Sequence, residues 1–118
     1  MGLDGMRGSE RAKSEQELSN ILSNIVGERI IFETDGDTHS IDSDTLRFSF
    51  VLHDDSFEIR NIESTAPGVG SSVLEAVHHF CDEKDLDVFA SNVKENVHGF
   101  WRSMGYEEGQ DGDFFRTE

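Results

Sequence analysis

A glycine-containing turn between an expected strand and an expected helix carries the residues best suited to bind a ligand. The turn, residues 66–72 (Ala-Pro-Gly-Val-Gly-Ser-Ser), follows the alternating residues Phe57 and Ile59. It precedes a helical stripe of apolar residues: Val73, Leu74, Val77, Phe80 and Cys81. Such a turn exposes backbone N–H groups at the positive end of a helix dipole, a common phosphate site. Many strand-to-helix turns use glycine for geometry alone, so the turn by itself does not establish an anion site.

A second segment, residues 92–106, supports the same interpretation. It predicts a short helix with one buried side, formed by residues at i, i+3, i+4 and i+7: Val97, Phe100, Trp101 and Met104. Gly105 stands where a left-handed C-terminal cap belongs, and Tyr106 begins a new extended segment. The chain therefore contains a strand, a Gly-x-Gly turn, a helix, a strand and a second helix that ends in glycine and an aromatic residue.

This order and spacing resembles the C-terminal half of the GNAT superfamily of acyl-CoA-dependent N-acetyltransferases. The resemblance covers about residues 56–107. Gly68-Val69-Gly70 is similar to the end of the family's Gln/Arg-x-x-Gly-x-Gly/Ala loop, and residues 96–106 are similar to its later Asn-to-aromatic segment. The resemblance implies an α+β fold in a single domain, with a splayed mixed β-sheet and helices on both faces.

The resemblance also implies a cofactor site. Acetyl-CoA would be the co-substrate, and an amine would attack its thioester directly. The cofactor diphosphate would bind the N–H groups of Gly68, Val69, Gly70, Ser71 and Ser72. The backbone at Ile62 would stabilise the developing oxyanion, and Asn96 or Asn92 would bond the pantetheine arm.

Catalytic roles follow from the same resemblance. Glu63 is the first choice for the general base, and Glu58 is the second. The family's tyrosine, which assists the leaving thiolate, falls on Trp101, whose indole donates a hydrogen bond but has no useful acidity. Thr65 stands where the family has Gln or Arg. These departures leave two alternatives open: a catalytically weak or inactive binding module, and a cofactor-free acidic interaction protein.

The alternation of the strand before the turn is broken, and two interpretations explain the break equally well. Phe57 and Ile59 keep a period of two, whereas Ile62 breaks it. An extra residue near Arg60 or Asn61 would explain the break, as would a strand that ends at Arg60. In the GNAT family, a bulge in the equivalent strand separates two strands of the sheet.

The N-terminal half has simpler signals. Residues 1–12 lack periodicity and are expected to form a flexible tail, with the domain covering residues 13–118. A capping-box sequence at Ser14 predicts a helix that ends at Gly27. Strands are expected over residues 29–32, 39–41 and 46–52, and later over residues 86–90 and 114–115.

The charge balance restricts the function. The 118 residues include 25 acidic and 10 basic residues, a net charge of −15, which excludes a basic nucleic-acid-binding surface. The acidic residues are spread through every segment, which favours solvation in a salt-rich cytoplasm over a patch that attracts a cation or mimics a polyanion. We therefore expect a cytoplasmic protein of a halophilic organism. No apolar run of roughly 18 residues and no signal sequence occurs, so no membrane partner is expected.

Metal and thiol chemistry are not expected. Cys81 is the single cysteine and lies on the apolar side of a helix, so it predicts a packing role. His78 and His79 point about 100° apart on a helix and cannot chelate together. The expected partner is a small-molecule or peptide amine that the sequence does not identify. A homodimer that covers an exposed sheet edge is also plausible.

Overall fold

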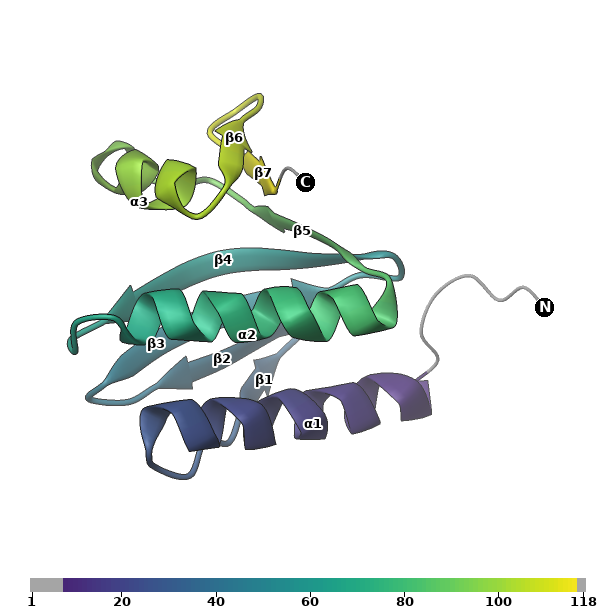
Figure 1. The fold of residues 1–118 in the computed structure, drawn as a ribbon. Coiled ribbons are helices and arrows are strands. Elements are labelled where there is room, and N and C mark those ends of the chain that lie inside the picture. Colours follow the sequence, from purple (N-terminus) through teal and green to yellow (C-terminus); the bar gives the residue numbers. More distant parts are fainter. Residues whose placement is uncertain (1–7, 117–118) are drawn as a thin grey trace.

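A computed structural model describes the backbone of residues 8–116 and the side chains of residues 13–116 (Figure 1). The strands are β1 (Glu33–Asp35), β2 (Thr38–Asp42), β3 (Leu46–Leu52), β4 (Ser56–Ser64), β5 (Asp87–Ala90), β6 (Tyr106–Glu108) and β7 (Phe114–Arg116). The helices are α1 (Gly8–Val26), α2 (Val69–Lys84), the 3-10 helix η1 (Glu95–Val97) and α3 (His98–Ser103). The strands form one sheet in the order β1-β2-β3-β4-β5-β7-β6, in which only the β4–β5 pair is parallel. The predicted α+β fold with a mixed sheet in one domain is confirmed.

One side of the sheet is apolar because apolar residues alternate along its central strands. Phe48 and Phe50 of β3 lie on the same side as Phe57 of β4, and all three are almost fully buried. The rings of Phe50 and Phe57 stack with centroids 4.7 Å apart. Burial of each such side chain contributes about 1.5–3 kcal/mol to folding. This aromatic layer is the centre of the core.

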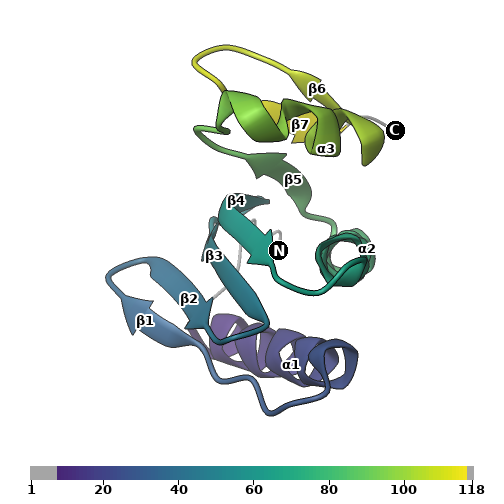
Figure 2. The same cartoon turned by 90° about the vertical axis from the view of Figure 1, so that its left-hand side faces the viewer.

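All three helices pack on this apolar side, although helices on both faces were expected. Leu18 and Leu22 of α1 are fully buried in the core, and α1 lies beside α2 (Figure 2). Tyr106 of β6 links the other two helices, because its hydroxyl bonds His78 of α2 and its ring meets Trp101 of α3 at 4.9 Å. α2 and α3 therefore share one face.

The handedness of chain crossovers explains this one-sided arrangement. α2 connects the parallel strands β4 and β5, and α3 connects β5 to β6, which runs parallel to β5 because β7 lies antiparallel between them. Both connections step in the same direction across the sheet, so right-handed crossovers place both helices on the same face. Within the described residues no helix covers the opposite face, where the rings of Phe89 and Phe115 stack 5.7 Å apart.

The first helix is longer than expected. It begins at Gly8, so residues 8–12 belong to α1 and not to the expected tail, whereas residues 1–7 lie outside the described part of the chain. The helix ends at Val26, and Gly27 follows in the left-handed conformation with φ of 83°. The predicted C-terminal boundary at Gly27 is therefore confirmed.

The strand expected over residues 29–32 is wrong, since β1 begins at Glu33. The main chain of Ile30 bonds to serine side chains of α1 and not to a neighbouring strand. Its N–H donates to Oγ of Ser23 at 2.8 Å, and the hydroxyl of Ser19 donates to its carbonyl oxygen. Because these serines satisfy its polar groups, the segment packs on α1 without entering the sheet.

A half-buried polar cluster joins α2 to the last two strands. The hydroxyl of Tyr106 lies 2.6 Å from Nε2 of His78, and Arg116 donates two hydrogen bonds to Asp82 at 2.8 and 3.3 Å. Burial, assisted by the charge of Arg116, lowers the pKa of His78 to about 4, so its ring is neutral at neutral pH. Burial also raises the pKa of the Cys81 thiol to about 12, and Cys81 packs in the core as expected.

We predict that His78 makes the fold less stable in mild acid. The unfolded chain binds a proton at this residue below pH 6.5, whereas the folded chain does so only near pH 4. Stability therefore falls as the pH drops through this window, by about 1–2 kcal/mol between pH 7 and pH 5 when partial exposure is allowed for. His78→Gln can still bond Tyr106 but does not titrate, so it should lack this loss. Denaturant unfolding of both proteins at the two pH values, in the same salt, measures the difference. Equal losses would contradict the prediction.

Candidate functional site

β4 contains a bulge, one of the two alternatives that the sequence left open. Ile59 pairs with Phe50 of β3, and Asn61 pairs with the adjacent Ser49, so Arg60 is skipped in the register. The bulge resets the alternation of side chains, and Ile62 therefore returns to the apolar face opposite Phe48. The parity break in the sequence thus reflected an extra residue and not the end of the strand.

β4 and β5 separate at this bulge. Their parallel pairing ends with Ile59 and Ala90, and the N–H of Ser91 makes a last bond to the carbonyl of Ile59 at 2.9 Å. β4 then continues to Ser64, whereas the chain after β5 turns away at Asn92, which has a left-handed φ of 52°.

Contacts to the β6–β7 turn hold the departing chain in place. The N–H of Asn92 donates to Oδ1 of Asp113 at 3.0 Å. The N–H of Val93 donates to the carbonyl of Gly112 at 2.8 Å. These two bonds fix the chain away from β4, so the gap between the strands is a built feature of the fold.

The separation leaves a cleft of about 140 Å³ between the end of β4, the segment after β5 and α3. Its lining brings together five residues that were expected at the site from the sequence: Ile62, Glu63, Asn92, Asn96 and Trp101. Glu63 is exposed at the rim and accepts a hydrogen bond from the side-chain amide of Asn61 at 3.0 Å. Asn96 is exposed in η1.

Trp101 combines a packing role with a free donor. Its side chain is 4% exposed, and its ring meets Phe100 and Tyr106 edge to face. In the described part of the chain, no group accepts a hydrogen bond from its Nε1–H. Because Trp101 lines the cleft, this N–H is a candidate donor to a ligand there. Val97, expected on the same buried side of the helix, is instead 38% exposed.

The predicted amide corner lies at the start of α2. Gly68 has φ of 81°, a left-handed conformation that favours glycine, and the helix begins at Val69. Across residues 8–116, the N–H groups of Gly68, Gly70 and Ser71 have no acceptor. Those of Val69 and Ser72 bond the carbonyls of Ala66 at 3.3 Å and Gly68 at 3.0 Å. Three of the five predicted amides are thus available, and two are used within the turn.

The amide corner and the cleft lie at the same edge of the sheet. Only four residues separate the end of β4 from the start of α2, so the first turn of α2 stands beside the carboxyl ends of β4 and β5. The end of β4, the start of α2 and α3 all lie at the left of Figure 1, and Figure 2 faces this side. Ligands of open α/β sheets commonly bind at such an edge, where neighbouring strands part.

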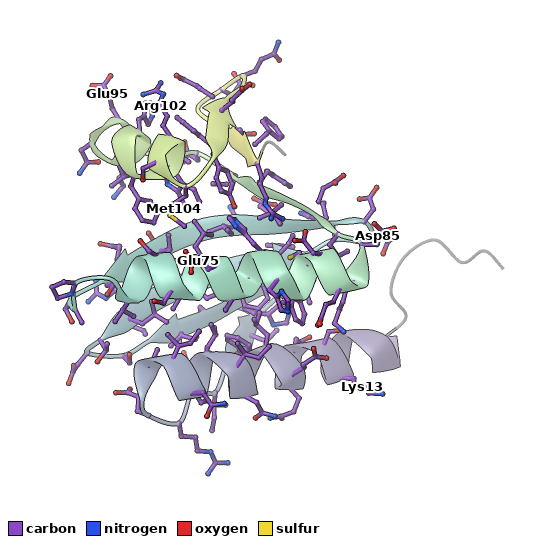
Figure 3. All side chains as sticks on the ribbon, viewed as in Figure 1. Lys13, Glu75, Asp85, Glu95, Arg102 and Met104 are labelled. Carbon is purple, nitrogen blue, oxygen red and sulfur yellow. The ribbon has the colours of Figure 1, made fainter. Side chains whose placement is uncertain are left out.

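Two cations line the cleft in an otherwise acidic protein. The chain has ten basic residues, and Arg60 and Lys94 stand at the cleft. Both are exposed, and neither forms a salt bridge with another residue that the structure describes. Glu63 lines the cleft with them, and other acidic side chains project elsewhere, as Glu75 and Asp85 show (Figure 3). Neither cation was expected at the site, because the two residues lie far apart in the sequence and come to the same cleft only in the folded protein.

Thr65 has a structural role. Its hydroxyl donates to the carbonyl of Asp44 at 3.0 Å, and its N–H donates to the carbonyl of Thr45 at 3.1 Å. These bonds tie the turn after β4 to the connection between β2 and β3. Thr65 therefore anchors the amide corner and does not replace the Gln or Arg contact of the resembled loop.

Two further features of the described residues concern metal binding and membranes. They contain no group of three or more His, Cys, Asp or Glu side chains arranged to hold a metal ion. None of the described helices has the length and apolar character required to span a membrane.

Comparisons with known proteins show the fold alone. No family model matches the chain, and no curated protein matches its sequence. Among solved structures, the anti-CRISPR protein AcrVA5 is similar, with a TM-score of 0.52 and 18% sequence identity. The match covers 63% of this chain and 87% of that chain.

We predict that deletion of Arg60 narrows the cleft and preserves the fold. Ile59 and Asn61 then become neighbours and keep their partners in β3, so every other β4 side chain stays on its face. β5 can extend its pairing along β4, and backbone amide exchange at residues 61–63 should slow by about tenfold. Hydrogen–deuterium exchange measures this change, with Arg60→Gln as the control that keeps the extra residue. Equal exchange in the deletion and the control would show that the bulge does not separate the strands.

Proposed function

We propose that the chain binds acetyl-CoA along this edge and transfers the acetyl group to an amine by direct attack. One observation carries the proposal: β4 and β5 part at a bulge, directly beside a helix start where three N–H groups have no acceptor among residues 8–116. The diphosphate of acetyl-CoA can accept hydrogen bonds from these amides. Its narrow pantetheine arm, which carries the acyl group, can lie in the gap between the strands.

The phosphate end of the cofactor has favourable local charge. The amides of Gly68, Gly70 and Ser71 and the side chains of Arg60 and Lys94 all lie at this edge. The net charge of −15 opposes an anion at long range. In molar salt the screening length is about 3 Å, so these local contacts decide binding. High salt inside the source organism, which the acidic composition favours, is consistent with this requirement.

The acyl end fits the size of the cleft. Sites that enclose a whole ligand commonly measure about 300–1,000 Å³. The volume of about 140 Å³ here suits the arm and the thioester, while the nucleotide lies outside on the helix start. Backbone at Ile62 and the side chain of Asn96 are the proposed contacts of the arm.

The reaction requires few protein groups. Glu63 at the rim removes a proton from the ammonium group of the acceptor, which frees the nitrogen to attack the carbonyl carbon. The indole N–H of Trp101 donates to the cleft as charge develops. The carbon–sulfur bond then breaks, and the thiolate leaves without a protein acid because a thiol pKa near ~8.5 makes it a tolerable leaving group.

Ser71→Pro tests the cofactor site. Proline removes the N–H of Ser71, which bonds nothing in the described chain, and proline is tolerated in a first helical turn. Loss of one charge-assisted hydrogen bond should weaken acetyl-CoA binding by about tenfold or more, with little change in stability. Calorimetric titration in molar salt measures the affinity. Ser71→Ala is the matched control, since it loses the hydroxyl but keeps the N–H.

The same titration separates the proposal from its alternatives. Absence of binding by the wild-type chain would overturn the cofactor site and favour an acidic interaction protein. Binding without release of free CoA over a broad amine panel would favour an inactive binding module. Equal affinities for Ser71→Pro and Ser71→Ala would show that the diphosphate does not use this amide.

A further inference from the structure

A line of hydrogen-bonded side chains runs from the cleft to solvent. Ser91, which lines the cleft, donates its hydroxyl proton to Oε2 of Glu58 at 2.7 Å. The other carboxylate oxygen, Oε1, lies 2.8 Å from Nε2 of His53. The side chain of Glu58 is 15% exposed, whereas that of His53 is 44% exposed. The line therefore leads from a partly buried hydroxyl to a ring in contact with water.

The sheet fixes the position of all three groups on its helix-free face. Glu58 lies beside Phe89 in the β4–β5 register, and the ring of His53 stacks on the Phe89 ring with an interplanar angle of 16°. Ser91 is held by the last bond between the strands, from its N–H to the carbonyl of Ile59. Three separate segments thus converge on one carboxylate.

The surroundings keep Glu58 ionised. Burial raises the pKa of Glu58, but hydrogen bonds from Ser91 and His53, together with the charge of Arg60, outweigh it and lower the pKa overall. The residues that face the carboxylate from the neighbouring chain are uncharged: Phe89 of β5 and Ser91, which follows β5. A carboxylate with this environment accepts a proton briefly and passes it on.

We propose that Ser91, Glu58 and His53 conduct a proton of acetyl transfer from the cleft to solvent. This inference rests on the proposed function, in which an ammonium acceptor loses two protons. Glu63 removes the first proton before attack. The second leaves the nitrogen as the carbon–sulfur bond breaks. The departing thiolate takes up one proton from water, so each turnover releases one proton in total.

The transfer balances at each group. The oxygen of Ser91 accepts the proton from nitrogen while its own proton moves to Oε2 of Glu58. While Glu58 is protonated, the exposed ring of His53 exchanges protons with water, losing the proton on Nε2 and gaining one on Nδ1. The carboxyl then turns about its Cγ–Cδ bond and gives its proton to the freed Nε2. His53 releases its Nδ1 proton to water and returns to the neutral ring. Ser91 ends with one proton and Glu58 ends ionised, as both began. Glu58 and His53 are positioning residues, since neither lines the cleft.

Turnover by variants tests the path. Acetyl-CoA is mixed with n-butylamine, with spermidine or with water as acceptor, and release of free CoA is followed in molar salt. Glu58→Gln should reduce kcat by about a hundredfold, a typical contribution of proton transfer, with acetyl-CoA affinity unchanged. His53→Ala should reduce kcat by about tenfold, and added imidazole should restore it because the site faces solvent.

His79→Ala is the matched control, because His79 is also exposed and lies 3.6 Å from a carboxylate, that of Glu83, far from the cleft lining. It should keep the wild-type rate and gain nothing from imidazole. If the wild-type chain turns over and His53→Ala keeps the wild-type kcat, the proton path is overturned while acetyl transfer stands. The same conclusion follows if His53→Ala has a lower kcat that imidazole does not restore. Wild-type binding of acetyl-CoA without turnover would overturn both. Acetyl-CoA affinity, measured on each variant, separates a lost path from a lost cofactor site.

Discussion

The pairing of β4 with β5 stops at Ile59, and the rest of the candidate site depends on that stop. Parallel strands normally satisfy each other's backbone groups along their shared length. Here the extra residue Arg60 shifts β4, and bonds to Asp113 and Gly112 draw the other chain aside. The backbone that would have been paired borders a cleft instead. A defect of one residue in a regular sheet thus creates the space in which a ligand can lie.

The two faces of the sheet place histidines in different environments. The covered face carries the aromatic layer and the polar cluster around His78, whose buried ring stays neutral. The bare face carries His53, a ring open to water and bonded to Glu58. The same residue type therefore packs in a half-buried cluster on one side and faces water on the other. The difference arises from burial, because low exposure opposes a charged imidazole.

Sequence patterns predicted the parts of the fold that local chemistry determines. Gly27 and Gly105 marked helix ends because left-handed backbone favours glycine. The parity of Ile62 indicated either a bulge or an early strand end, and the pairing of β3 with β4 shows the bulge. The strand expected at residues 29–32 failed because tertiary bonds from serines of α1 replaced strand partners. Helices on both faces were expected from a family resemblance, whereas crossover handedness along this strand order decides the matter. Arg60 and Lys94 could not be linked in advance, since only the separation of two strands brings them to one cleft.

The burial of Cys81 has a practical consequence for reagents that detect sulfhydryl groups. It is the sole cysteine, it has no measurable exposure, and its pKa near 12 leaves almost none of the nucleophilic anion at neutral pH. A native sample should therefore be silent toward alkylating or disulfide-exchange dyes. In an assay with acetyl-CoA, colour that develops from the start would therefore report a thiol in solution, free CoA. Without added cofactor, a slow increase in colour would report unfolding of the protein.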